Sequence, residues 1–273
     1  MNSHITAYAC SHVGNVRTNN EDNIFVNGYC LNKKSTKKGR LYRSRSSNYM
    51  QLYSVCDGMG GQAAGEDASE IGVNMMRLLL QRLNMLDEPE AESVREEINR
   101  YTEDANRAVV DLPTDSGSTL TVLCIYGDRA TVAWLGDSRV YLLRANKLIQ
   151  LTEDHTEAER MKKMGINPAD KRASNSLTRY LGLDIPGLVA RPSYADEIGL
   201  KKGDVFLLCS DGVSNMVSDD ELKTILVKSL DPARKIIEAA LKAGGTDNAT
   251  AVVIDVERIN KPLFGNIGKG NKR

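Results

Sequence analysis

The chain lacks an excess of charge of either sign, because 36 Lys and Arg residues balance 36 Asp and Glu residues among its 273 residues. General binders of nucleic acid or of membrane surfaces need a basic excess, so neither class is expected, although a local basic patch remains open. No run approaches the roughly 20 apolar residues of a membrane span. The first 18 residues also lack the apolar core of a signal peptide.

Cysteine is scarce and shows no metal-binding or disulfide pattern. The chain has five cysteines, an odd number, and no C-x-x-C pair. Cys56, Cys124 and Cys209 lie in apolar runs, which is typical of reduced, buried thiols in a reducing cytosol. We therefore expect a cytoplasmic protein without a nucleic-acid partner or a membrane span, and a monomer. A chain of this length can form one domain. We expect residues 1–258 to form it and residues 259–273 to be a flexible tail.

Apolar residues recur at helical spacing in the first half of the chain. Residues 63–86 and 89–110 are each predicted to form an amphipathic helix, with Pro89 at the break between them. Shorter helices are predicted for residues 154–164, 219–229 and 232–243.

Most other segments are short, rich in β-branched or apolar residues, and bounded by turns. The predicted strands are residues 5–11, 23–29, 51–56, 119–126, 129–135, 139–143, 147–151, 205–209 and 250–256. Residues 32–48, which are basic and rich in Ser, are predicted to be a loop, and residues 165–176 to be irregular. Tight turns between strands favour an antiparallel α+β protein over a parallel array. We predict a central antiparallel β-sandwich flanked by helices on both sides, in four α-β-β-α layers.

Acidic residues stand repeatedly where a predicted strand meets a loop. Asp57 and Asp211 each follow an apolar strand and precede a glycine. Asp137 lies in a turn between two strands, Asp247 precedes the last strand, and Glu21-Asp22 precedes the second. Strands that pack rigidly would hold these carboxylates at defined positions.

Carboxylates that converge repel one another unless cations neutralise them. Mg²⁺ and Mn²⁺ prefer carboxylate and water oxygens, and a glycine after the carboxylate lets a backbone carbonyl approach the ion. For any single Asp-Gly pair an ordinary turn is the simpler interpretation. The recurrence of acidic residues at strand ends favours a metal centre. Arg17 lies near Glu21 in the sequence, and a guanidinium binds phosphate through two parallel hydrogen bonds.

Six motifs occur in order along the chain. They are Gly14-x-x-Arg17-x-x-Asn20-Glu21-Asp22, Val55-Cys56-Asp57-Gly58-Met59-Gly60-Gly61, Gly117-Ser118-Thr119, Gly136-Asp137-Ser138-Arg139, Ser210-Asp211-Gly212 and Gly245-Thr246-Asp247-Asn248. Each motif alone is weak. The ordered set resembles the bacterial branch of the protein phosphatase 2C family, the metal-dependent serine/threonine phosphatases. The resemblance covers residues 5–256.

This resemblance implies an active site with two Mn²⁺ or Mg²⁺ ions at one end of the sandwich. Asp57 would bridge both ions, and Asp211 and Asp247 would complete the first ion's site. The Gly58 carbonyl would bind the second ion.

The resemblance implies weaker or indirect roles for four further residues. Glu21 and Asp22 would act largely through bound water. Asp137, with help from Asp211, would hold a weaker third ion, and Arg17 would bind the substrate phosphate.

The expected reaction is hydrolysis of phosphoserine and phosphothreonine in proteins by a metal-bridging hydroxide, without a phosphoenzyme. Arg17 and the ions would offset the charge that builds on the phosphoryl oxygens. Many eukaryotic members have a His two residues after the bridging Asp. Met59 stands there in this chain, so we expect a metal-bound water to protonate the leaving group, and His155 to cap or pack. The implied partners are phosphorylated proteins, including a serine/threonine kinase and its substrates.

Two other functions are compatible with the residues alone. Two-metal chemistry also serves nucleases and small-molecule phosphatases, and only the resemblance favours phosphoproteins over their substrates. A catalytically inactive binding domain would be marked by a lost metal carboxylate, whereas every expected acidic position is filled.

Overall fold

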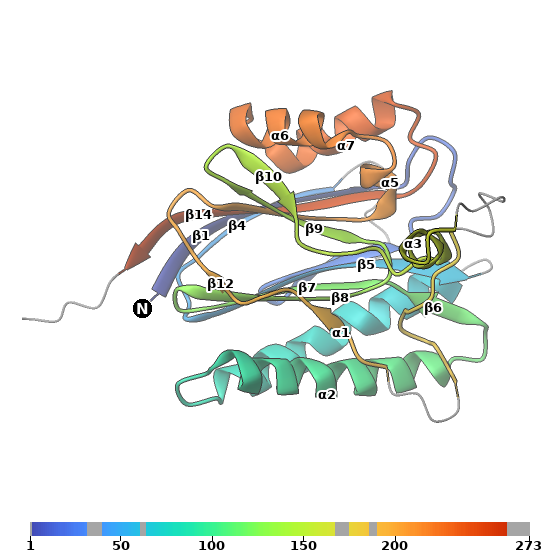
Figure 1. Ribbon diagram of the computed structural model, residues 1–273, viewed down its shortest axis with the longest axis horizontal. Coiled ribbons are helices and arrows are strands. Elements are labelled where there is room, and N and C mark those ends of the chain that lie inside the picture. Colours follow the sequence, from blue (N-terminus) through green and yellow to red (C-terminus); the bar gives the residue numbers. More distant parts are fainter. Residues whose placement is uncertain (1, 32–39, 61–63, 167–174, 186–189, 261–273) are drawn as a thin grey trace, which may run out of the picture.

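Four layers make up the computed structural model, which describes residues 2–31, 40–60, 64–166, 175–185 and 190–260 (Figure 1). Two antiparallel sheets pack face to face, and helices cover the outer face of each. The predicted α+β sandwich with flanking helices is confirmed. Within these ranges, none of the helices combines the length and the apolar character that crossing a membrane requires.

One sheet has six strands in the order β10-β9-β13-β14-β1-β4. Its strands are β1 (Asn2–His12), β4 (Arg40–Ser46), β9 (Arg139–Arg144), β10 (Lys147–Gln150), β13 (Val205–Cys209) and β14 (Ala249–Asn260). The first and last strands of the chain pair along their whole length, from Asn2 opposite Asn260 to His12 opposite Ala249. The two ends of the described chain are therefore neighbouring inner strands of the same sheet.

The other sheet has the order β11-β8-β7-β5-β2-β3, with β12 paired to β8 and β6 paired to β5. Its strands are β2 (Asp22–Val26), β3 (Tyr29–Cys30), β5 (Met50–Gly60), β6 (Ser116–Ser118), β7 (Leu120–Tyr126), β8 (Arg129–Leu135), β11 (Ser193–Tyr194) and β12 (Ile198–Gly199). All seven residues of β7 are buried, because one face packs on the opposite sheet and the other on helices.

The helices pack through the apolar stripes that their spacing predicts. α1 (Ala64–Asn84) and α2 (Ala91–Val110) cover the sheet that contains β5 and β7. α6 (Asp219–Lys228) and α7 (Pro232–Lys242) cover the six-stranded sheet. The remaining described helices are short: α3 (Glu157–Lys163) and α5 (Asp211–Ser214).

The prediction of a loop over residues 32–48 is wrong for its second part, which forms β4 at the edge of the six-stranded sheet. Arg43 lies over the ring of Tyr8 at 5.0 Å, and Tyr42 stacks on Tyr29 of the opposite sheet with ring centroids 3.8 Å apart. Charged side chains suit an edge strand because they discourage pairing with other chains. The basic composition therefore hid a strand. Residues 32–39 lie outside the described residues.

The prediction of one strand over residues 23–29 is also wrong. The chain turns at Asn27 and Gly28, which both have positive φ, and β3 then pairs back on β2. Asn-Gly is the standard sequence of a two-residue hairpin turn, so the sequence does contain the signal for this hairpin. The short elements β6, β11, β12 and α5 were not predicted. Residues 167–174 and 261–273, which include most of the predicted irregular segment and tail, lie outside the described residues.

The strand registers bring distant segments to one end of the sandwich. Asp22 pairs with Asp57, which places the start of β2 beside the last part of β5. Leu120 pairs with Leu135, so the turn between β8 and β9 lies at the same end. The end of β13 and the start of β14 meet there as well.

Burial of the α1 stripe should dominate the contribution of this helix to stability. Leu79 is fully buried, whereas the adjacent Leu78 is 44% exposed. Leu79→Ala leaves a cavity in a packed core and should lower the free energy of unfolding by about 2–5 kcal/mol. The matched control Leu78→Ala should change it by about 0.5 kcal/mol or less. Urea unfolding of both variants measures the difference, and equal losses would contradict this packing.

Candidate active site

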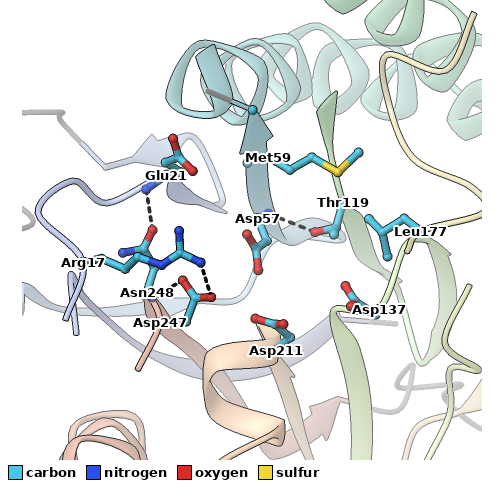
Figure 2. A pocket seen from close by; sticks show the side chains of 12 residues that line it. Arg17, Glu21, Asp57, Met59, Thr119, Asp137, Leu177, Asp211, Asp247 and Asn248 are labelled. Carbon is cyan, nitrogen blue, oxygen red and sulfur yellow. Dashed lines mark hydrogen bonds and ion pairs between the residues drawn. The ribbon is translucent and has the colours of Figure 1, made fainter. Parts of the chain in front are cut away.

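A cavity of about 240 Å³ lies at the end of the sandwich where these strand ends meet (Figure 2). All but one of the residues predicted for the site line it: Arg17, Glu21, Asp57, Gly58, Asp137, Asp211 and Asp247. The exception, Asp22, is only 3% exposed and lies behind the cavity, between the two sheets.

Asp57 is held by a neighbouring strand through its backbone. Its N–H donates to Thr119 Oγ1 at 2.9 Å, and the Thr119 N–H donates to the Asp57 carbonyl at 2.8 Å. Thr119 Oγ1 also lies 2.7 Å from Ser138 Oγ. The threonine hydroxyl thus links the Asp57 backbone to the turn that carries Asp137.

Gly58 has a packing reason to be glycine. A Cβ there would lie 2.0 Å from the Gly65 carbonyl oxygen and 2.8 Å from that of Glu21. The Gly58 N–H donates to the same Glu21 carbonyl at 3.1 Å. The backbone at Glu21 and at Gly65 therefore passes too close to Gly58 for any side chain there. This close packing holds Glu21 and the start of α1 against the end of β5.

Asp22 is a buried carboxylate with only part of its hydrogen-bonding capacity used. Ser210 Oγ donates to its Oδ2 at 2.7 Å, whereas its Oδ1 has no hydrogen-bond partner among the described residues. Burial raises the pKa of Asp22 to about 7. A buried carboxylate oxygen without a partner is costly, and a cation or an ordered water satisfies it.

Asp211 is the first residue of α5, directly after β13. The Asn215 side-chain amide donates to its Oδ2 at 3.1 Å. At Gly212 a Cβ would lie 1.9 Å from the carbonyl oxygen of Asn248. This close approach brings Asp211 against the segment that carries Asp247.

Arg17 contacts a carboxylate in this structure. Its Nη2 lies 2.8 Å from Asp247 Oδ2, and the two side chains are 53% and 35% exposed (Figure 2). Ion pairs this exposed are typically worth about 0–1 kcal/mol, so little energy opposes rotation of either side chain.

Asn248 fastens the loop that carries Arg17 and Glu21. Its Nδ2 donates to the carbonyls of Val13 at 2.9 Å and Asn19 at 2.8 Å, while its Oδ1 accepts from the Glu21 N–H at 2.8 Å. One buried amide at the start of β14 therefore fixes both ends of this loop.

Asp137 lies in the turn between β8 and β9, after Gly136 with a φ of +93°. A Cβ at Gly136 would lie 2.7 Å from the Thr119 side chain, so the turn packs directly on the residue that holds Asp57. Burial, and next the charge of Asp211, raise the pKa of Asp137 to about 7.

Repulsion extends across the whole cluster. Burial, followed by the charges of Asp22 and Asp211, raises the pKa of Asp57 well above its usual value. Burial also raises the pKa of Asp211, with Asp247 as the next cause, and burial raises the pKa of Glu21. The fold thus holds carboxylates together at a cost that a cation would remove.

The donor set fits a hard divalent cation. It consists of carboxylate and carbonyl oxygens, which suit Mg²⁺ and Mn²⁺, and the unpartnered Oδ1 of Asp22 is buried behind it. No group of three or more His, Cys, Asp or Glu side chains in the described ranges is arranged as a preformed metal site. The carboxylates surround the cavity instead, as expected of like charges that repel one another (Figure 2).

Thr119, Ser210 and Asn248 also shape the site, although no role is predicted for them from the sequence and each belongs to one of the six motifs. Their hydrogen bonds hold backbone segments and one carboxylate, and none of these partners is near in sequence. The only available signal was their position next to motif glycines and aspartates.

Comparison with known proteins gives a consistent result. The model of the family Protein phosphatase 2C matches residues 7–249. The chain is 31% identical over 252 residues to the serine/threonine protein phosphatase PstP of Mycobacterium tuberculosis. The aligned region covers 89% of this chain and 43% of PstP, which is a longer protein. It is also 31% identical over 258 residues to the protein phosphatase PhpP of Streptococcus pneumoniae, covering 89% of the chain and 94% of that protein.

Solved structures agree in fold. The catalytic domain of PstP in complex with two manganese ions superposes with a TM-score of 0.70 at 30% identity, covering 94% of this chain and all of that one. The serine/threonine phosphatase of S. agalactiae gives a TM-score of 0.74 at 28% identity, covering 93% of this chain and all of that one. The family match spans most of the chain, and the relatives agree with it in sequence and in fold, so the chain belongs to the protein phosphatase 2C family of serine/threonine protein phosphatases.

Proposed function

We propose that this chain hydrolyses phosphoserine and phosphothreonine in proteins by a metal-bridging hydroxide, with two Mn²⁺ or Mg²⁺ ions. The observation that carries the proposal is the convergence of carboxylates from five chain segments on one cavity that also contains an arginine (Figure 2). Family membership supports it, and so does the two-manganese complex of the related PstP domain.

The proposed roles follow the positions of the donors. Asp57 lies between the other carboxylates (Figure 2) and would contact both ions. Asp211 and Asp247 would complete the site of the first ion, and the carbonyl of Gly58, which also lines the cavity, would bind the second. When bound, the ions supply an acidified water and positive charge next to the phosphoryl oxygens. The Thr119 hydrogen bonds would keep Asp57 in place as the charge around it changes.

Indirect ligands and a weaker third site complete the proposal. Glu21 and Asp22 would orient water, which suits the unpartnered Oδ1 of Asp22. Asp137, with help from Asp211, whose charge acts on it, would hold the third ion.

Arg17 would exchange one partner for another during the reaction. A cation that engages the Asp247 carboxylate competes with the guanidinium for the same oxygen atoms, and the exposed ion pair is weak. The released guanidinium would then bind the substrate phosphate through two hydrogen bonds. Among the described residues that line the cavity there is no histidine, which supports water as the leaving-group acid.

Cavity size supports a macromolecular substrate. Pockets that enclose small molecules typically measure about 300–1,000 Å³, whereas this cavity measures about 240 Å³. It has room for a phosphorylated side chain, and the rest of the substrate would lie outside it. The cavity thus suits phosphorylated proteins as substrates. We also propose, from the family alone, that the partners include a serine/threonine kinase and its substrates, and that the protein is a cytoplasmic monomer.

Asp57→Asn should abolish Mn²⁺-dependent turnover, with a loss of at least about a hundred-fold, because the nearly isosteric amide cannot neutralise two cations. Hydrolysis of a phosphothreonine peptide with and without chelator measures it. The matched control is Asp128→Asn, at the opposite end of β7 and β8, which should leave activity unchanged. Near-normal activity of Asp57→Asn would show that the centre is assigned wrongly.

Arg17→Ala should lower kcat/KM for phosphopeptides about ten- to a hundred-fold, mainly through KM, because it removes a charge-assisted phosphate contact and no metal ligand. Steady-state kinetics over a range of peptide concentrations separates the two constants. A change smaller than about two-fold would mean that Arg17 stays away from the substrate.

Mn²⁺ should stabilise the protein more at high pH. The raised pKa values of Asp22 and Asp137, about 7 against a usual 3.8, mean that the native metal-free protein holds protons that the unfolded chain has released. Holding these protons stabilises the native metal-free protein relative to the unfolded chain. This contribution to the free energy of unfolding is fully present below about pH 4 and is lost as the pH rises through 7.

Because metal binding requires deprotonated carboxylates, Mn²⁺ should raise Tm clearly at about pH 8 and only slightly at about pH 5. Thermal unfolding with Mn²⁺ or chelator at both pH values tests this expectation, and Asp57→Asn should reduce the effect. An equal rise at both pH values would contradict it.

A further inference from the structure

His155 lies directly behind the active-site turn without lining the cavity. Its side chain is 8% exposed and stacks on Trp134, with ring centroids 5.8 Å apart and planes 16° apart. The Trp134 indole donates to the Glu153 carbonyl at 2.7 Å, which holds the segment that leads into His155. The His155 ring is therefore held in one orientation by its packing on Trp134.

Two hydrogen bonds join His155 to the turn that carries Asp137. The Gly136 N–H donates to His155 Nδ1 at 3.2 Å, and the His155 N–H donates to the Gly136 carbonyl at 2.9 Å. Gly136 is the residue next to Asp137, so these bonds hold the peptide that sets the direction of that carboxylate.

The other edge of the ring faces the flap, which we define as the described residues 156–166 and 175–182, including α3. The Thr178 N–H donates to the His155 carbonyl at 2.8 Å, and His155 Nε2 lies 3.0 Å from Ser193 Oγ. Arg179 Nη1 donates to the same hydroxyl at 2.8 Å, and Arg179 Nη2 contacts the Arg191 carbonyl. His155 thus lies between the Asp137 turn, the flap and β11.

These contacts select one form of the ring. Nδ1 accepts from the Gly136 N–H and so has no proton, which places the proton of the neutral ring on Nε2. There it faces Ser193 Oγ at 3.0 Å, whereas Arg179 Nη1, 3.5 Å away, is itself a donor and cannot accept it. Burial, and next the charge of Arg179, lower the pKa of His155 to about 4, so the neutral ring is the stable one at neutral pH. A neutral ring with one acceptor and one donor can join two polar segments.

We propose that His155 is a positioning residue that holds the Gly136–Asp137 turn against the flap, and that it sets the position of the Asp137 carboxylate relative to Asp57 and Asp211. The inference rests on the proposed role of Asp137 in binding an ion. The geometry supports this role, because His155 binds both the N–H and the carbonyl of Gly136, and the same turn packs on Thr119, which holds Asp57.

A set of variants separates positioning from packing. His155→Ala removes both hydrogen bonds of the ring, whereas the side-chain oxygen of His155→Asn can take the place of Nδ1 and accept from the Gly136 N–H. We expect His155→Ala to lower kcat about ten-fold and to raise the half-saturating Mn²⁺ concentration by a similar factor, with KM for a phosphopeptide nearly unchanged. His155→Asn should recover most of both losses.

The matched control is His4→Asn, whose ring lies at the far end of β1 beside Arg258, and which should behave as the parent protein. Thermal unfolding in chelator shows whether each variant is folded. Equal impairment of His155→Ala and His155→Asn, matched by equal losses in Tm, would overturn the proposal and leave a packing role. Parent-like kinetics of His155→Ala would also overturn it.

A double-mutant cycle tests whether His155 acts through Asp137. If it does, Asp137→Asn combined with His155→Ala should be no more impaired than Asp137→Asn alone. Losses that multiply would overturn the inference. A parent-like Mn²⁺ dependence of Asp137→Asn would remove its premise. The proposed function is judged separately, because it fails only if the parent lacks Mn²⁺-dependent phosphatase activity or Asp57→Asn retains it.

Discussion

The repulsion among carboxylates at one end of the sandwich is the constraint on which the rest of the structure depends. Asp57, Asp137 and Asp211 each have a pKa raised first by burial and next by a neighbouring carboxylate. A flexible chain would separate such groups. Here the stability of two packed sheets and their helices holds them together, and a bound cation would relieve their repulsion.

The carboxylates are held mainly through the backbone beside them. Thr119 binds the Asp57 peptide, Asn248 binds the Glu21 loop, and His155 binds the peptide next to Asp137. Neutral donors and acceptors suit this purpose, since they fix the main chain while leaving the carboxylate oxygens free for ions. Three carboxylates are also contacted directly by a side chain at one oxygen: Asp22 by Ser210, Asp211 by Asn215 and Asp247 by Arg17.

The same arrangement connects the chemistry to the surface. The Asp57 peptide is linked through Thr119 and Ser138 to the β8–β9 turn, and this turn is linked through His155 to the flap. The network is continuous from the buried end of β5 to exposed segments where a protein substrate would approach. The flap and the Asp137 turn therefore share His155 as a common contact.

Most of the architecture, and the acidic residues that line the cavity, could be predicted from the sequence alone. Apolar spacing was enough to find α1, α2 and the buried strands, because burial on both faces leaves a strong local signal, and the ordered motifs identified the acidic residues. The local pattern gave wrong predictions where a strand was rich in charged residues or was very short. β4 was hidden by its arginines, and the β2–β3 hairpin by its short second strand.

Only the tertiary structure decided which groups meet. That Asp22 lies behind the cavity, that Arg17 contacts Asp247, and that His155 binds the Gly136 peptide all depend on strand register and on segments far apart in the chain. A hydrogen bond between residues 19 or 230 positions apart leaves no periodic trace in the sequence, because its geometry arises only once the two sheets have packed.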